Sequence, residues 1–209
     1  MSDFYLASHS ARRRELLRQI GARFETLLLR SASPRGPDIS ESIQQGEAPV
    51  DYVLRVAREK AERGVQTLAS RSLLLRPVLG ADTVVIVDGD ILGKPEDAQQ
   101  AARFLERLSG RTHEVRTAVA LALPRPASER RNSVWTSVSV TQVTLRTMDA
   151  AEIMGYCASG EPFDKAGGYA IQGRAAIFVE RIEGSYSGVV GLPLAETASL
   201  LTRAGVRLL

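Results

Sequence analysis

The chain has few of the residues that build disulfides and zinc sites. Its 209 residues include one cysteine, Cys157, and two histidines. One cysteine excludes an internal disulfide and fits a reducing compartment. The same set is too small for a closed zinc site of the usual type. We expect Cys157 to be a small core residue rather than a nucleophile.

A strong charge of one sign and long apolar runs are also lacking. The formal net charge is +3, too weak to indicate a nucleic-acid-binding protein by itself. The apolar runs are far shorter than the roughly 18 residues that span a membrane. The opening "MSDFYLASHS" lacks the basic start and apolar core of a secretory signal. We therefore expect a cytoplasmic protein that binds neither nucleic acid nor a membrane.

The composition that remains is that of a globular protein, with 44% hydrophobic and 24% charged residues. This length suits one domain over residues 1–209 with two lobes. Periodicity, caps and turn residues predict strands over 4–8, 24–29, 84–87, 91–92, 115–123, 133–145 and 176–182. They predict helices over 11–20, from 49 onward, over 97–108 and 149–158, and from 193 to near 204. Long loops are expected over 31–49 and, with basic residues, over 124–132. These elements indicate an α/β or α+β fold with a mixed sheet and flanking helices.

The segment "LASHSARRRELL" has the wrong charge for a helix start. Arg12, Arg13 and Arg14 occupy the first turn, where the helix dipole favours acidic residues. A strand–turn–helix junction offers free backbone N–H groups, and Ser8 and Ser10 add hydroxyls. A bound polyphosphate would therefore neutralise the positive charge of the arginines and that of the helix N-terminus. The alternative is three solvated arginines behind an ordinary Ser10 cap.

Two further segments place charge beside apolar strands. In "GADTVVIV", Asp82 lies within an apolar run, where a carboxylate is costly to bury unless it is paired or binds a metal. It is a candidate base or magnesium ligand, or else a turn residue between strands. In "DGDILGKP", Asp88 and Asp90 suit a tight hairpin. Lys94 between Gly93 and Pro95 suits a phosphate contact or an exposed loop.

Three more residues have weaker local signals. Lys60 of "REKAE" has the pattern of a solvated helix face, and Glu41 of "ISES" has no local explanation. In "DKAGGYAIQGRAA", glycines allow close approach of the backbone, and Gln172 lies among them. Its amide could pair with the edge of uracil or thymine, although it would not exclude cytosine. The alternative is a loop with packing glycines.

Taken together, these segments resemble the Maf family of nucleoside triphosphate pyrophosphatases. The resemblance also covers "DYVLRVAREKA", "LGKPEDAQQAARFLERLSGRTHEVRTAVAL" and "GSYSGVVGLPLAET", all in the family's order. One position departs from it, because Ala11 replaces the family's usual proline. The resemblance implies an elongated mixed sheet, two lobes around a deep cleft as in inosine triphosphate pyrophosphatases, and cleavage between the α and β phosphates. It implies a requirement for Mg²⁺ or Mn²⁺ and leaves a homodimer open.

The resemblance also implies roles for individual residues. Ser8, Arg12 and Arg13 match the phosphate-binding first motif. Glu41, Lys60, Asp82 and Lys94 match the charged active-site set, and Asp82 matches the base that activates water. From the residues themselves, we expect the carboxylates of Asp82 and Glu41 to hold the metal ion, and whether Asp82 is base, metal ligand or both stays open. Arg12, Thr83 and Gln172 match the branch that acts on dTTP and UTP, whereas the 7-methyl-GTP branch has tryptophan, glutamine and glutamate there. Two alternatives stay open: the 7-methyl-GTP activity and a non-catalytic nucleotide-binding regulator of cell division, for which the basic loop over 124–131 is the best support.

Overall fold

The computed structural model describes residues 2–30, 38–124 and 133–208. The basic loop expected over 124–132 and part of the loop over 31–49 therefore lie outside the described residues. The chain divides into two compact units. The first comprises Met1–Asp82, Ala118–Val138 and Gly191–Leu209, and the second comprises Thr83–Thr117 and Ser139–Val190. In the part of the chain that is described, no helix is both long and apolar enough to cross a membrane.

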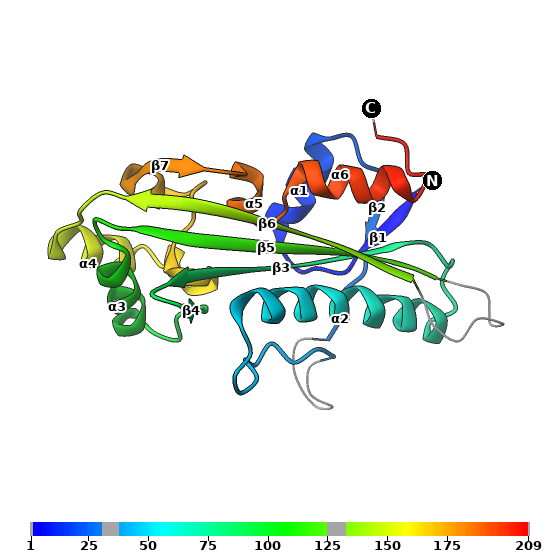
Figure 1. Ribbon diagram of the computed structural model, residues 1–209, viewed down its shortest axis with the longest axis horizontal. Coiled ribbons are helices and arrows are strands. Elements are labelled where there is room, and N and C mark those ends of the chain that lie inside the picture. Colours follow the sequence, from blue (N-terminus) through cyan, green and yellow to red (C-terminus); the bar gives the residue numbers. More distant parts are fainter. Residues whose placement is uncertain (1, 31–37, 125–132, 209) are drawn as a thin grey trace. The chain divides into compact units, whose positions relative to one another are not determined.

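The described strands form one mixed sheet (Figure 1). They are β1 (Phe4–Leu6), β2 (Phe24–Thr26), β3 (Val78–Val87), β4 (Asp90–Leu92), β5 (Thr112–Leu123), β6 (Ser133–Leu145) and β7 (Val179–Glu183). Their order is β2-β1-β3-β5-β6-β7, with β4 paired to β3. β1 is parallel to β2 and to β3, whereas β3–β4 and β6–β7 are antiparallel. The predicted α/β class with a mixed sheet is confirmed.

Helices flank this sheet. They are α1 (Ala11–Gln19), α2 (Pro49–Ser70), α3 (Ala98–Leu108), α4 (Ala150–Ala158), α5 (Tyr186–Val190) and α6 (Leu194–Arg203), with 3₁₀ turns at Glu161–Asp164, Ala166–Gly168 and Arg174–Phe178. Local signals set several of their ends. Pro49 lies in the first turn of α2, and Asp149 forms a reciprocal capping box with Glu152 at α4.

In the first unit, α2 packs closely on β3. Val53, Val56 and Ala57 of α2 are fully buried. Gly80 of β3 makes the close approach possible, since a Cβ atom there would lie 2.4 Å from the carbonyl oxygen of Ala57. The absence of a Cβ atom at Gly80 therefore allows the short spacing between this helix and this strand.

In the second unit, α3 and α4 cover a core that includes Cys157. Cys157 is buried and unpaired, and burial raises the pKa of its thiol, so its predicted role as a core residue is confirmed. Beside this core, His113 Nε2 lies 2.7 Å from the Tyr169 hydroxyl.

Some predicted elements were wrong in position. Asp82 was placed in a turn by one interpretation, yet it lies inside the continuous strand β3. The predicted strand over 176–182 begins only at Val179, because Arg174–Phe178 forms a 3₁₀ helix. The hairpin after β3 is confirmed, with left-handed backbone at Asp88 (φ 54°) and Gly89 (φ 83°).

Candidate active site

The first turn of α1 is held by serine side chains. Ser10 is the N-cap, and its hydroxyl accepts a hydrogen bond from the backbone N–H of Arg13 at 3.4 Å. Ser8 is buried, and its hydroxyl accepts from the Ser10 N–H at 3.2 Å. No acidic residue lies in this first turn. The three-arginine start of the helix is therefore real, and the first turn holds positive charge without an acidic residue.

Arg13 ties this helix to β3. Its Nε donates to the Gly191 carbonyl at 2.7 Å, and its Nη1 donates to the Ala81 carbonyl at 2.8 Å. Burial lowers the pKa of Arg13, while the negative charges of Asp82 and Glu41 act in the opposite direction. Arg13 therefore carries its charge next to the backbone that positions Asp82. Its predicted contact with phosphate stays a prediction, as does that of the partly buried Arg12.

Lys60 joins the two predicted carboxylates. Its Nζ lies 2.8 Å from Asp82 Oδ1 and 2.7 Å from Glu41 Oε1. The side chains of Lys60 and Asp82 are 14% and 12% exposed, whereas Glu41 is 50% exposed. The solvated-face interpretation of Lys60 was wrong, because its ammonium lies in a partly buried ion-pair network. Burial of the Asp82 carboxylate would be costly without a partner, and Lys60 provides that partner.

The close packing of α2 on β3 makes this network possible. A Cβ at Gly80 would also lie 2.7 Å from the Ala61 amide nitrogen and 3.1 Å from Lys60 Cβ. Without that Cβ, the helix backbone approaches the strand two residues before Asp82. The glycine of "GADT" therefore brings the ammonium and the carboxylate together, a role that the sequence interpretation did not assign.

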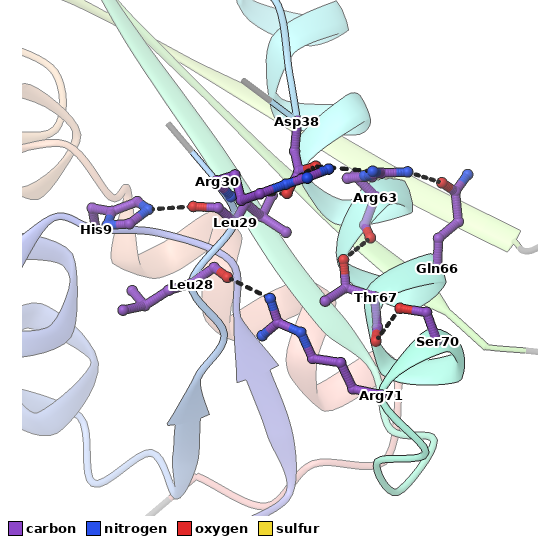
Figure 2. Close-up of polar contacts among 10 residues, drawn as sticks. All are labelled: His9, Leu28, Leu29, Arg30, Asp38, Arg63, Gln66, Thr67, Ser70 and Arg71. Carbon is purple, nitrogen blue, oxygen red and sulfur yellow. Dashed lines mark hydrogen bonds and ion pairs between the residues drawn. The ribbon is translucent and has the colours of Figure 1, made fainter. Parts of the chain in front are cut away.

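The segment that carries Glu41 is anchored at Asp38 (Figure 2). Asp38 Oδ1 accepts from Arg30 Nη2 at 2.7 Å and from Arg63 Nη2 at 2.8 Å. These bonds hold the pKa of Asp38 well below its ordinary value. The Asp38 side chain is 5% exposed although both arginines are partly exposed. The described part of the loop therefore begins at a buried, fully charged anchor.

The donor set fits a divalent ion shared with phosphate. Asp82 and Glu41 supply hard carboxylate oxygens, and they already converge on one positive group, Lys60 Nζ. Among the described residues, no group of three or more His, Cys, Asp or Glu side chains could hold a metal ion. Mg²⁺ commonly uses one or two carboxylates and completes its shell with water and substrate phosphates. The arrangement suits that mode of binding.

Thr83, Lys94 and Gln172 belong to the second unit. Thr83 Oγ1 lies 2.9 Å from the buried Thr117 Oγ1, which lies 2.7 Å from the Gly188 carbonyl oxygen. Thr117 is the donor in both contacts, so its single hydroxyl hydrogen is given either to Thr83 Oγ1 or to the Gly188 carbonyl. Thr117 thereby orients Thr83.

Lys94 and Gln172 are both exposed. Lys94 lies between β4 and α3, and its neighbour Gly93 accepts a backbone bond from Gly167 at 2.9 Å. Gln172 lies in a turn that is fixed by Glu161. The Glu161 carboxylate accepts from the Arg174 N–H at 3.0 Å and from the Tyr156 hydroxyl at 2.9 Å.

The sequence interpretation missed Glu161 and the residues that position Glu41. The glycine at position 173 is the sequence feature that could have indicated a close neighbour in this turn. A Cβ at Gly173 would lie 2.2 Å from the Glu161 carboxylate. The helix residues Tyr52 and Arg55, which contact the loop around Glu41, lie in the segment "DYVLRVAREKA". Nothing local in that segment distinguishes Arg55 from a solvated arginine.

Comparison with known proteins assigns the chain to a family. A family model described as Maf-like protein matches residues 3–204. A dTTP/UTP pyrophosphatase of Nitrosomonas europaea is 51% identical over 202 residues, which is 97% of this chain and 94% of the relative. A dTTP/UTP pyrophosphatase of Bordetella parapertussis is 53% identical over 202 residues, 97% of this chain and 92% of the relative. The chain belongs to the Maf family.

Solved structures give weaker similarity. A HAM1 protein from Coxiella burnetii is 19% identical and superposes with a TM-score of 0.43, covering 97% of this chain and 100% of that chain. Function is therefore inferred from the sequence relatives and not from these structures.

Proposed function

We propose that this protein hydrolyses dTTP and UTP, and modified pyrimidine triphosphates, to the nucleoside monophosphate and pyrophosphate. The observation that carries the proposal is the similarity to relatives named dTTP/UTP pyrophosphatase, at 50–53% identity over 97–98% of this chain. The ion-pair network of Lys60 with Asp82 and Glu41 supports it, because the two carboxylates could hold the divalent ion that accompanies a polyphosphate and the ammonium could contact phosphate oxygens.

In the proposed reaction, water attacks the α-phosphorus. A new phosphorus–oxygen bond forms, the bond from the α-phosphorus to the bridging oxygen breaks, and pyrophosphate leaves with that electron pair. Asp82 would orient the water and accept its proton. Lys60 and Arg13 would offset the negative charge that develops on the leaving group.

A divalent ion, Mg²⁺ or Mn²⁺, fits this proposal. Asp82 and Glu41 would hold it, and Lys60 would then turn from the carboxylates toward phosphate oxygens. When bound, the ion would neutralise charge on those oxygens and polarise the α-phosphate. Activity should therefore disappear in excess chelator and return when Mg²⁺ is added.

Pyrophosphate release by the purified full chain tests the proposal. With Mg²⁺, we expect turnover of dTTP and UTP, and a loss of at least about a hundredfold for Asp82→Asn, comparable to removing a general base or a strong electrostatic contribution. Arg58→Gln is the matched control, because Arg58 is exposed on the same helix as Lys60. Equal activity of Asp82→Asn and wild type would remove Asp82 from the mechanism.

The substrate panel separates the alternatives. Preference for 7-methyl-GTP over dTTP and UTP would assign the protein to the other branch of the family and overturn the roles of Arg12, Thr83 and Gln172. No turnover of any triphosphate would favour a nucleotide-binding regulator without catalysis.

A further inference from the structure

Three consecutive backbone carbonyls around Glu41 are held by side chains of one helix. The Tyr52 hydroxyl donates to the Glu41 carbonyl at 2.9 Å. Arg55 donates through Nη1 to the Ser40 carbonyl at 3.3 Å and through Nη2 to the Ser42 carbonyl at 3.0 Å. The backbone before, at and after Glu41 is therefore fixed to α2, although the Glu41 side chain itself is half exposed.

Arg55 also closes the far end of this loop. Its Nε lies 2.6 Å from Glu47 Oε1, and its Nη2 lies 2.8 Å from Glu47 Oε2. This bidentate pair is the geometry that arginine forms most strongly with a carboxylate. Glu47 in turn accepts from the Gln44 N–H at 3.0 Å. With Asp38 anchored by Arg30 and Arg63 (Figure 2), both ends of the segment that carries Glu41 are fixed by buried carboxylates.

The environment of Arg55 differs from that of a solvated helix arginine. Its side chain is 18% exposed, and Glu47 is 8% exposed. The guanidinium carbon lies 5.5 Å from the centre of the Tyr52 ring, so the two clamping side chains also stack on each other. Hydrogen bonds from Arg55 hold the pKa of Glu47 at about 2, so this pair stays charged throughout the neutral range.

We propose that Arg55, assisted by Tyr52, is a positioning residue that fixes the backbone of Glu41 so that its carboxylate meets Lys60 beside Asp82. This inference rests on the proposed function, in which Glu41 holds the divalent ion, and it names a residue that acts on that site through Glu41. An exposed carboxylate on an unanchored loop would have to be ordered each time metal and substrate bind. Arg55 removes that cost in advance.

A double-mutant cycle tests whether Arg55 acts through Glu41. Arg55→Gln should lower kcat/KM about 10–100-fold and raise the Mg²⁺ concentration needed for half-maximal activity by a similar factor, as is usual for residues that orient metal ligands. Tyr52→Phe should lose less, because it removes one hydrogen bond only. Arg58→Gln on the same helix is the control and should match wild type.

The cycle distinguishes positioning from general structural support. In the Glu41→Gln background, Arg55→Gln should cost no further activity, because the carboxylate that it positions is already gone. Equal losses in both backgrounds would overturn the proposal. Arg55→Lys should recover only part of the activity, since one ammonium cannot reach two carbonyls and both Glu47 oxygens together.

Hydrogen exchange gives a readout that does not depend on turnover. Arg55→Gln should accelerate amide exchange in residues 39–48, where the Gln44 amide is bonded to Glu47, and leave β3 and the rest of α2 unchanged. Unchanged exchange in that segment would overturn the clamp even in an active enzyme. If wild type hydrolyses no triphosphate, the proposed function fails, while faster exchange would still support the clamp.

Discussion

At the scale of single residues, the charged side chain of Arg13 is held in position by backbone carbonyl groups. Arg13 begins a helix with the wrong sign for the dipole, yet it donates to the carbonyls of Gly191 and Ala81. Leaving such carbonyls unpaired would cost about 1–3 kcal/mol each. The unfavourable helix position of Arg13 is therefore offset locally, before any phosphate is bound.

His113 is the residue whose titration should be visible in stability. It is 2% exposed, and no partner for its Nδ1 is found within the described part of the chain. Burial lowers the pKa of His113 to about 4 from 6.5. The folded protein therefore keeps the ring neutral, whereas the unfolded chain takes up a proton below about pH 6.5.

We expect His113 to make the protein less stable in mild acid. Because its pKa is lower in the folded state, its contribution is complete above about pH 6.5 and is lost as the pH falls toward 4. The loss amounts to about 3 kcal/mol over that range. Urea unfolding of wild type and His113→Gln from pH 7 to pH 4 measures it, and the wild-type curve should fall more steeply.

Parallel stability curves for the two proteins would contradict this assignment. A direct check is the NMR titration of the His113 ring, which should change near pH 4. Titration near 6.5 would show that burial does not control this side chain.

At the scale of elements, the spacing of α2 and β3 is the feature on which the candidate site depends. We expect Gly80→Ala to push the helix from the strand, because the added Cβ would lie 2.4 Å from a backbone oxygen that cannot move independently. Overpacking of this kind costs about 1–3 kcal/mol or more. Since Lys60 and Asp82 lie across this contact, activity should fall at least about tenfold as the pair separates.

Gly155→Ala is the matched control for that variant. Gly155 lies inside α4, and a Cβ there would have no neighbour within 4 Å. Alanine in a helix interior is favoured over glycine by about 1 kcal/mol, so this variant should be as stable as wild type or more so. Thermal unfolding and pyrophosphate release of both variants give the comparison. If Gly80→Ala matched wild type in stability and activity, the contact between α2 and β3 would be able to relax.

The sequence predicted those elements that have local chemical signals. Pro49 marks the start of α2, Asp149 caps α4, and the Asp88–Gly89 turn joins β3 to β4. The start of β7 was placed too early, because the 3₁₀ helix over Arg174–Phe178 follows a turn that is fixed by the distant Glu161. Such elements depend on contacts between segments far apart in the chain.

In the candidate site, too, some residues could be predicted from local sequence, whereas others depend on contacts between distant segments. The residues that resemble a family motif could be named from sequence, and the structure brings Glu41, Lys60 and Asp82 together. Arg55 and Gly80 could not be assigned, because their roles exist only once α2 lies against β3 and the loop. An arginine that clamps a loop and an arginine in solvent have the same local sequence pattern.

At the scale of the whole molecule, binding of substrate should appear as global stabilisation. Ser8, Arg12 and Arg13, which match the phosphate-binding first motif, belong to the first unit, and Lys94, Thr83 and Gln172 belong to the second. A ligand that binds only the folded state raises the free energy of unfolding by about 2.7 kcal/mol at a hundred times its Kd. For a chain of this size, that corresponds to a rise in Tm of roughly 5–10 °C.

We expect dTTP with Mg²⁺ to give that rise in the Asp82→Asn variant, in which the ligand is not consumed. Pyrophosphate alone should give a smaller shift, because it lacks the base that Gln172 is expected to contact through its amide. Differential scanning calorimetry at matched concentrations of dTTP, pyrophosphate and 7-methyl-GTP measures the three shifts. A shift with 7-methyl-GTP equal to that with dTTP would contradict pyrimidine selection. Equal shifts with dTTP and pyrophosphate would mean that the base adds nothing to recognition of the nucleotide.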